Sequence, residues 1–191
     1  MGPAGEISTR HHGVVNALYH SVMTVGGLAV REPKGLASDS GLRPDLQIVF
    51  PGQHLLVDVV VAHPLTESLC ASTKALAGGA GVARQMQGRK QRKYKQLTAQ
   101  QEATFFAFAA ESCGGLAPEA VQLLRLISEI GQDHLSLWPH YEIVKHMLGS
   151  VAVAIQRGNA MTVLSGYTNT MAKGWEKGEG VAVSGQAALA H

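Results

Sequence analysis

The sequence predicts a mixed fold of the α/β or α+β class, in which helices cover a β-sheet. Apolar residues recur at helical spacing near the N-terminus and through the second half of the chain, whereas short runs rich in Val, Ile and Leu lie between them. These elements follow the order α-β-β-β-α-β-α-α, which is typical of a sheet packed against helices. Apolar residues make up 46% of the 191 residues and charged residues 16%, so a single domain with a sizeable core is expected.

The first helix is predicted over Thr9–Val25, and Gly26-Gly27 ends its pattern. Its apolar residues recur at a spacing near 3.6, which is the period of an α-helix. They are Val14, Val15, Leu18, Val22 and Val25. The preceding residues, 1–8, are expected to form a disordered leader.

Three strands are predicted next, and a tight turn joins the second to the third. Their ranges are Leu28–Glu32, Asp45–Phe50 and His54–Ala62. Pro33–Leu42 carries Pro, Gly, Ser and Asp residues and is expected to be a loop, while Pro51-Gly52 supplies the turn of a hairpin. The third strand is almost continuously apolar, which indicates burial on both of its faces.

The second half of the chain is predicted to be helical around one further strand. Helices are expected at Val82–Leu97, Ala117–Ile130 and Pro139–Gln156, and the strand at Thr104–Ala110. Gly158-Asn159 is expected to break or kink the last helix before a segment that ends near Met171. The organisation expected is therefore one domain at 9–172 with a C-terminal helical extension, a mobile Leu65–Gly81 segment and a flexible tail at 173–191.

Composition excludes several classes of protein. Cys70 and Cys113 cannot form a disulfide framework and contain no CxxC pair for zinc, so a reducing compartment is expected, nuclear or cytoplasmic rather than secreted. No apolar run is long enough to suggest a membrane span, and no signal peptide is visible. The net charge of +2 does not by itself indicate a nucleic-acid binder, and the distribution of charge along the chain is more informative on this point.

Two carboxylates are expected to meet in the predicted hairpin. Arg43-Pro44-Asp45 opens one strand, and Asp58 follows 13 residues later within the next. A charge inside an apolar strand is costly unless it is paired or binds a metal, and two carboxylates suit a hard cation such as Mg²⁺. Pro-Asp is also a common turn dipeptide, and Asp58 alone would fit an edge or strand-end residue. Together the two match the first half of the PD-(D/E)xK nuclease pattern.

The lysine of that pattern is absent from the strand, where Val60 stands, but the following basic helix can supply one. Lys90 and Lys93 share a helical face with Val82, Met86 and Leu97, at steps of 4, 4, 3 and 4 residues. The alternative is that both lysines extend to solvent at the edge of the core. Other cations nearby are candidate contacts for DNA phosphates: Arg43, Arg84, Arg89, Arg92 and Lys95.

Three motifs in this order resemble the restriction-like endonuclease domain of site-specific non-LTR retrotransposons, which is similar to archaeal Holliday-junction resolvases. They are Arg43-Pro44-Asp45, the strand 57–61 ending in Ala62-His63-Pro64, and Lys90-Gln-Arg-Lys93-Tyr94. The resemblance implies a PD-(D/E)xK restriction-endonuclease-like core with additional C-terminal helices, in which the active-site lysine has moved from the strand to the helix.

The resemblance also implies an activity, a metal-dependent DNA endonuclease that nicks target DNA. Asp45 and Asp58 would then bind Mg²⁺ or Mn²⁺. Lys90 or Lys93 would orient the water or stabilise the transition state, and Tyr94 would flank them. Lys93 is slightly favoured because Tyr94 beside it completes the motif. A reverse-transcriptase module would be supplied elsewhere. The alternatives are a DNA-binding module of the same fold without catalysis, and a resolvase-like nuclease that acts as a homodimer.

Three further polar sites have both a functional and a structural interpretation. His11-His12, at the start of the first helix, lies near the site if related enzymes are a guide, but it equally fits a surface pair. His63 ends the Asp58 strand on the opposite face of the sheet. Glu111 ends the fourth strand, where it either supports the site or is a plain strand-end charge.

Overall fold

The computed structural model describes residues 3–36, 42–65, 80–134 and 138–176. Four strands form one mixed sheet in the order β1-β2-β3-β4, where β1–β2 and β2–β3 are antiparallel and β3–β4 is parallel. The strands are β1 (Leu28–Arg31), β2 (Leu46–Phe50), β3 (Gln53–Ala62) and β4 (Thr104–Glu111). The predicted hairpin at Pro51-Gly52 is confirmed, with Phe50 paired to Gln53.

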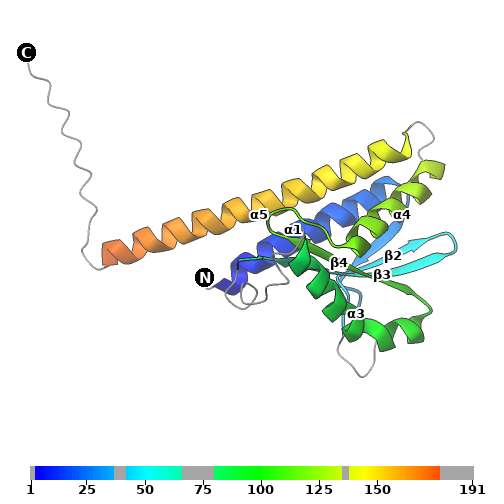
Figure 1. The fold of residues 1–191 in the computed structure, drawn as a ribbon, viewed down its shortest axis with the longest axis horizontal. Coiled ribbons are helices and arrows are strands. Elements are labelled where there is room, and N and C mark those ends of the chain that lie inside the picture. Colours follow the sequence, from blue (N-terminus) through cyan, green and yellow to red (C-terminus); the bar gives the residue numbers. More distant parts are fainter. Residues whose placement is uncertain (1–2, 37–41, 66–79, 135–137, 177–191) are drawn as a thin grey trace, which may run out of the picture.

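Helices cover both faces of the sheet (Figure 1). They are α1 (Pro3–Thr24), α3 (Gly81–Gln101), α4 (Pro118–His134) and α5 (His140–Glu176). α1 and α4 pack on one face, and α5 lies across both of them as a second helical layer. α3 is the helix of the described residues that covers the other face, against β3 and β4.

β3 is central to this packing because its two faces enter different clusters. Leu55, Val57 and Val59 point toward α1 and α4 in the main core. Leu56 points the other way and packs against Tyr94 and Leu97 of α3. The nearly continuous apolar run is thus explained by burial on both faces, as the sequence predicted.

The predicted order of elements is the observed order, but two details differ. α1 begins at Pro3, so most of the expected leader, residues 1–8, is helical. α5 is continuous through Gly158-Asn159 and ends at Glu176, so the predicted break there is wrong and the first four residues of the expected tail are helical. Residues 177–191 and most of the predicted mobile segment, residues 66–79, lie outside the described ranges.

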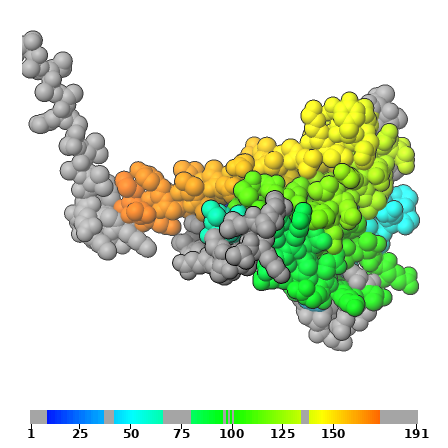
Figure 2. Space-filling view, viewed as in Figure 1, coloured from blue at the N-terminus to red at the C-terminus, as the bar shows by residue number. Residues whose placement is uncertain are grey.

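Gly158 is tolerated in the middle of α5 because the helix passes very close to α1 at this point. A Cβ at position 158 would overlap Cγ of Arg10 and lie 2.8 Å from its Cα. Close helix packing therefore outweighs the roughly 1 kcal/mol that glycine costs in a helix. Beyond this crossing, α5 projects away from the rest of the molecule, as the orange end in Figure 2 shows.

Within the described residues, no helix has both the length and the apolar character needed to cross a bilayer.

Candidate functional site

The β2–β3 hairpin brings the two predicted carboxylates together. Leu46 pairs with Val57, so the preceding residue, Asp45, lies level with Asp58. The backbone N–H of Val59 donates to Oδ2 of Asp45 over 2.6 Å. The side chain of Asp45 therefore continues the strand pairing just before β2 begins at Leu46.

Asp58 is buried on the α3 side of the sheet, with 4% of its surface exposed. The residue beside it in β4 is Ala107, and Ala109 follows on the same face. These small side chains let α3 approach the sheet closely enough for its own side chains to reach Asp58. Oδ1 of Asp58 accepts a hydrogen bond of 2.7 Å from the Tyr94 hydroxyl, and Oδ2 forms an ion pair with Nζ of Lys90.

Tyr94 is a buried polar residue of α3, with 1% of its surface exposed. Its ring stacks on Phe105 of β4 at a centroid distance of 4.7 Å. Its hydroxyl also lies 2.9 Å from the carbonyl oxygen of Arg43, so two acceptors compete for its single proton. Burial, and then the hydrogen bond to Asp58, raise the pKa of Tyr94, which keeps it a neutral donor.

The structure distinguishes the two candidate lysines. Lys90 and Tyr94 are four residues apart and share one helical face, and that face meets Asp58. Lys93 is exposed, and its ammonium lies over the Tyr94 ring, 5.3 Å from the centroid. The shared stripe predicted for both lysines therefore holds for Lys90, which contacts the carboxylate, while Lys93 makes a cation–π contact instead.

His11 joins the site from α1. Its Nε2 lies 3.0 Å from Oδ2 of Asp45, whereas His12 is exposed. The hydrogen bond to Asp45 is the largest cause that raises the pKa of His11, and it outweighs the opposing effect of burial. The sequence carried a signal for this, because His11 precedes Val15 by four residues and Leu18 by seven, on the buried stripe of α1.

A cleft of about 340 Å³ opens beside Asp45. Its lining comes from α1, from β1 and from the segment before β2, and it carries both positive and negative side chains. The lining residues are His11, His12, Val15, Asn16, Arg31, Glu32 and Asp45. Solvent therefore reaches the Asp45 end of the carboxylate pair, whereas Asp58 is covered by α3.

The predicted DNA-binding cations lie around this region without contacting the carboxylates. Arg43 pairs with Glu32 over 2.8 Å, and its carbonyl oxygen is the one near the Tyr94 hydroxyl. The four on α3 are all exposed: Arg84, Arg89, Arg92 and Lys95. They lie on the solvent side of the helix whose inner side carries Lys90 and Tyr94.

Glu111 has a positioning role that neither sequence interpretation described fully. It is buried, and its Oε1 accepts the backbone N–H groups of Val82 and Ala83 at 3.0 and 3.3 Å. These are among the N–H groups that have no partner within the first turn of α3, and a carboxylate there also complements the helix dipole. Glu111 thus anchors the start of the helix that carries Lys90. His63 instead contacts the Ser112 hydroxyl at 2.7 Å.

The donor set is compatible with a hard divalent cation. Among the described residues, no group of three or more His, Cys, Asp and Glu side chains could hold a metal. Mg²⁺, however, is commonly bound through one or two carboxylates while water completes its shell. Oδ2 of Asp58 is buried and has no hydrogen-bond partner, only the ion pair with Lys90. Asp45 and Asp58 are therefore the residues that would hold Mg²⁺ or Mn²⁺.

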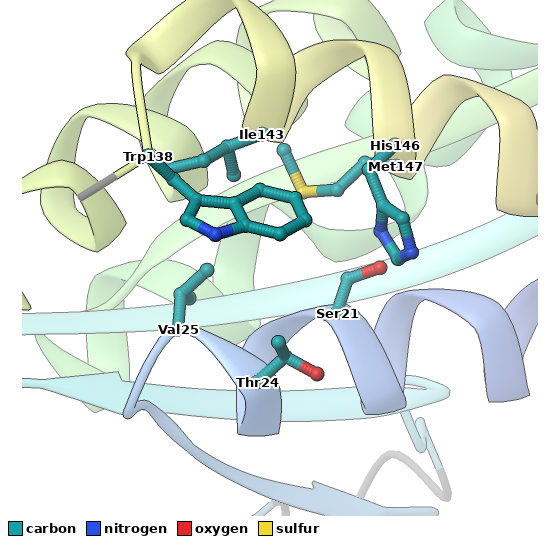
Figure 3. Close-up of a pocket in the computed structure, with 7 residues that line it drawn as sticks. All are labelled: Ser21, Thr24, Val25, Trp138, Ile143, His146 and Met147. Carbon is teal, nitrogen blue, oxygen red and sulfur yellow. The ribbon is translucent and has the colours of Figure 1, made fainter. Parts of the chain in front are cut away.

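A separate apolar pocket lies at the other end of α1. It has a volume of about 260 Å³, and Figure 3 shows it between α1 and the start of α5. It is lined by Ser21, Thr24, Val25, Trp138, Ile143, His146 and Met147. Ser21 lies ten residues along α1 from His11, which corresponds to about 15 Å, so this pocket is not part of the carboxylate site.

Comparison with known proteins adds no family to this description. No family model matches the chain, and no curated protein matches it.

Proposed function

We propose that this chain is a metal-dependent DNA endonuclease domain with a PD-(D/E)xK restriction-endonuclease-like core, of the kind found in site-specific non-LTR retrotransposons. The observation that carries the proposal is the convergence of Asp45, Asp58 and Lys90. These residues come from a hairpin and from a helix that follows it: Asp45 lies level with Asp58 across the hairpin, and Lys90 pairs with Asp58. The order of elements around them, with β4 parallel to β3, is compatible with such a core.

The site has the parts that hydrolysis of a phosphodiester requires. A divalent cation held by Asp45 and Asp58 supplies activation of water and neutralisation of charge on the phosphate. Tyr94 holds Asp58 in place through its hydroxyl. Lys90 presents a positive charge at the carboxylate pair, where it stabilises negative charge that develops on the phosphate oxygens.

A plasmid-nicking assay with Mg²⁺ tests the proposal. Asp58→Asn keeps the size of the side chain and should abolish nicking. Lys90→Met should reduce nicking by roughly 10²-fold, by analogy with other electrostatic groups at active sites. Lys93→Met is the matched control on the same helix and should nick nearly as fast as the wild type, because the Lys93 ammonium lies over the Tyr94 ring whereas Lys90 pairs with Asp58. Equal loss in both lysine variants would refute the assignment.

DNA binding is tested separately, on the outer side of α3. Arg89→Ala combined with Arg92→Ala should weaken binding to duplex DNA and lower its salt dependence together, because each phosphate contact releases counterions. Sequence preference should stay small, since phosphate contacts position a protein without specifying bases. Unchanged affinity in the double variant would place the DNA surface elsewhere.

The second candidate is a DNA-binding module that has kept the fold and lost catalysis. It is favoured by one observation, that Lys90 already neutralises Asp58 directly. Wild-type protein that binds DNA but does not nick it with Mg²⁺ or Mn²⁺ would support this alternative.

Preferential cutting of four-way junctions by a dimer would instead support a resolvase-like nuclease. A reverse-transcriptase module in trans, and a nuclear or cytoplasmic location, belong to the retrotransposon proposal.

A further inference from the structure

A second cavity, lined mostly by polar residue types, lies where β3 and β4 end side by side. It has a volume of about 500 Å³ and is open to solvent. Its walls come from α1, from the residues that follow the two parallel strands, and from α5. They are Arg10, His63, Ser112, Cys113, Gln156, Asn159, Thr162 and Val163. None of these residues is acidic, and one carries a permanent positive charge.

Arg10 is held in this cavity by neutral groups. Its Nη1 donates to Oδ1 of Asn159 at 3.3 Å, and Nδ2 of Asn159 in turn donates to the Ser112 carbonyl at 2.8 Å. Its Nε is buried and has no hydrogen-bond partner among the described residues. A buried donor without a partner costs free energy, and here it belongs to a cation that pairs with no carboxylate among the described residues. Within the described part of the chain, the cavity therefore lacks one component, an anionic acceptor.

The nearest buried carboxylate does not supply that acceptor. Glu111 is not part of the cavity lining, and its Oε1 is taken up by two N–H groups of α3. Its Oε2 accepts a hydrogen bond of 3.4 Å from the Cys113 thiol. The guanidinium of Arg10 and the amide N–H groups of Gln156 are donors suited to phosphate oxygens, while the Asn159 amide is already bonded to Arg10 and Ser112.

The position of the cavity relates it to the carboxylate site. His63 follows Asp58 by five residues along β3, which corresponds to about 16 Å of extended chain. Five base-pair steps of duplex DNA cover about the same length, at about 3.4 Å each. Arg10 is also the neighbour of His11 in α1, so the cavity and the cleft beside Asp45 share α1 as a wall.

We propose that this cavity binds a backbone phosphate of the substrate DNA, about five nucleotides from the phosphate at Asp45 and Asp58. The inference rests on the proposed function, because it takes DNA to be the substrate. It adds a second anchor that sets the distance and direction of the DNA across the carboxylates. Arg10 is a binding residue in this arrangement, and Asn159 positions it.

The test is duplex binding measured by fluorescence anisotropy in EDTA, across a series of salt concentrations. Arg10→Ala should weaken binding by about 10-fold, as expected for a lost hydrogen bond to a charged group. It should also reduce the slope of log affinity against log salt by about 0.9, which is one phosphate. Gln156→Glu places a negative charge on the cavity wall from an exposed position and should weaken binding without threatening the fold.

Gln132→Glu is the matched charge control, because it makes the same change at an exposed position near the end of α4 and should bind like the wild type. Wild-type protein that fails to bind DNA would refute the proposed function itself. Wild-type binding with unchanged affinity and slope in Gln156→Glu and in folded Arg10→Ala would overturn this inference alone. If Arg10→Ala does not fold, as judged by circular dichroism, Gln156→Glu decides.

One further arm distinguishes the source of the phosphate. Inorganic phosphate at millimolar concentration should compete with DNA for the wild type and have less effect on Gln156→Glu. If phosphate raises the melting temperature of the wild type while DNA affinity stays equal in all variants, the cavity binds free phosphate, and the DNA anchor is wrong.

Discussion

Lys90 and Asp58 should be strongly coupled in stability, and the coupling should be asymmetric. Asp58 has 5% of its side chain exposed, whereas Lys90 has 25% exposed and can extend its ammonium toward water. Lys90→Met leaves a buried carboxylate that keeps only the Tyr94 hydroxyl as a partner. Asp58→Asn leaves a lysine that solvent can still reach. The first change should therefore be more destabilising than the second.

The magnitudes follow from these exposures. Removing one partner of a buried ion pair costs about 3–5 kcal/mol, and partial access of water around Lys90 places Lys90→Met near 3 kcal/mol. Asp58→Asn retains an acceptor for Tyr94 and should cost about 1 kcal/mol. Replacing both partners removes the uncompensated charge, so the double variant should also lose about 1 kcal/mol. The coupling free energy is then about 3 kcal/mol, at the upper end for residues in contact.

Urea unfolding followed by circular dichroism measures the free energy of unfolding of the wild type, the two single variants and the double variant, which together form a double-mutant cycle. Lys93→Met serves as a control, because its ammonium is exposed and it should change the free energy of unfolding little. An Asp58→Asn variant as unstable as Lys90→Met, or a double variant that loses the sum of both, would refute the reasoning. Lys90 would then be a solvated surface lysine that merely lies near the carboxylate.

Three other changes have defined outcomes. The pKa of His11 is raised by Asp45, so its stabilising contribution is complete below about pH 6.5 and is lost as pH rises through the raised value; in EDTA, His11→Ala should therefore destabilise more at low pH than at high pH. Gly158→Ala should cost about 1–3 kcal/mol by overpacking against α1, whereas Gly166→Ala, which has nothing within 4 Å, should be neutral or stabilising in the same urea assay. Tyr94 should stay protonated at about pH 11, above the usual tyrosine pKa of about 10, so Tyr94→Phe should leave the tyrosinate absorbance of the folded protein unchanged.

The sequence could predict the order of elements because each depends on local pattern. The hairpin at Pro51-Gly52 and the doubly buried strand around Asp58 are each determined by a few adjacent residues. The break predicted at Gly158 failed for a reason that lies outside local pattern. Glycine there meets Arg10, which is 148 residues earlier in the chain, and only the tertiary packing shows that a small residue is needed.

The candidate site could be predicted from the sequence only in part, because local spacing shows which face of a helix a residue lies on but not which strand it contacts. Helical spacing put Lys90 on the inner face of α3, but it could not separate Lys90 from Lys93, because both lie near the edge of one stripe. The stacking of Tyr94 on Phe105 decides between them, and that contact joins a helix to a strand. The capping of α3 by Glu111 likewise depends on where β4 ends, which no spacing within the helix reveals.

The bond from the Val59 amide to Asp45 has a practical consequence. β2 begins only at Leu46, which pairs with Val57, so no residue of β2 lies opposite the Val59 amide, and the Asp45 carboxylate takes the place of a backbone carbonyl. Protection of the Val59 amide from hydrogen–deuterium exchange therefore depends on one side chain of the site. The exchange rate of this one amide would therefore report whether the Asp45 side chain is in position. It can be measured in protein without DNA, and it does not depend on catalytic activity.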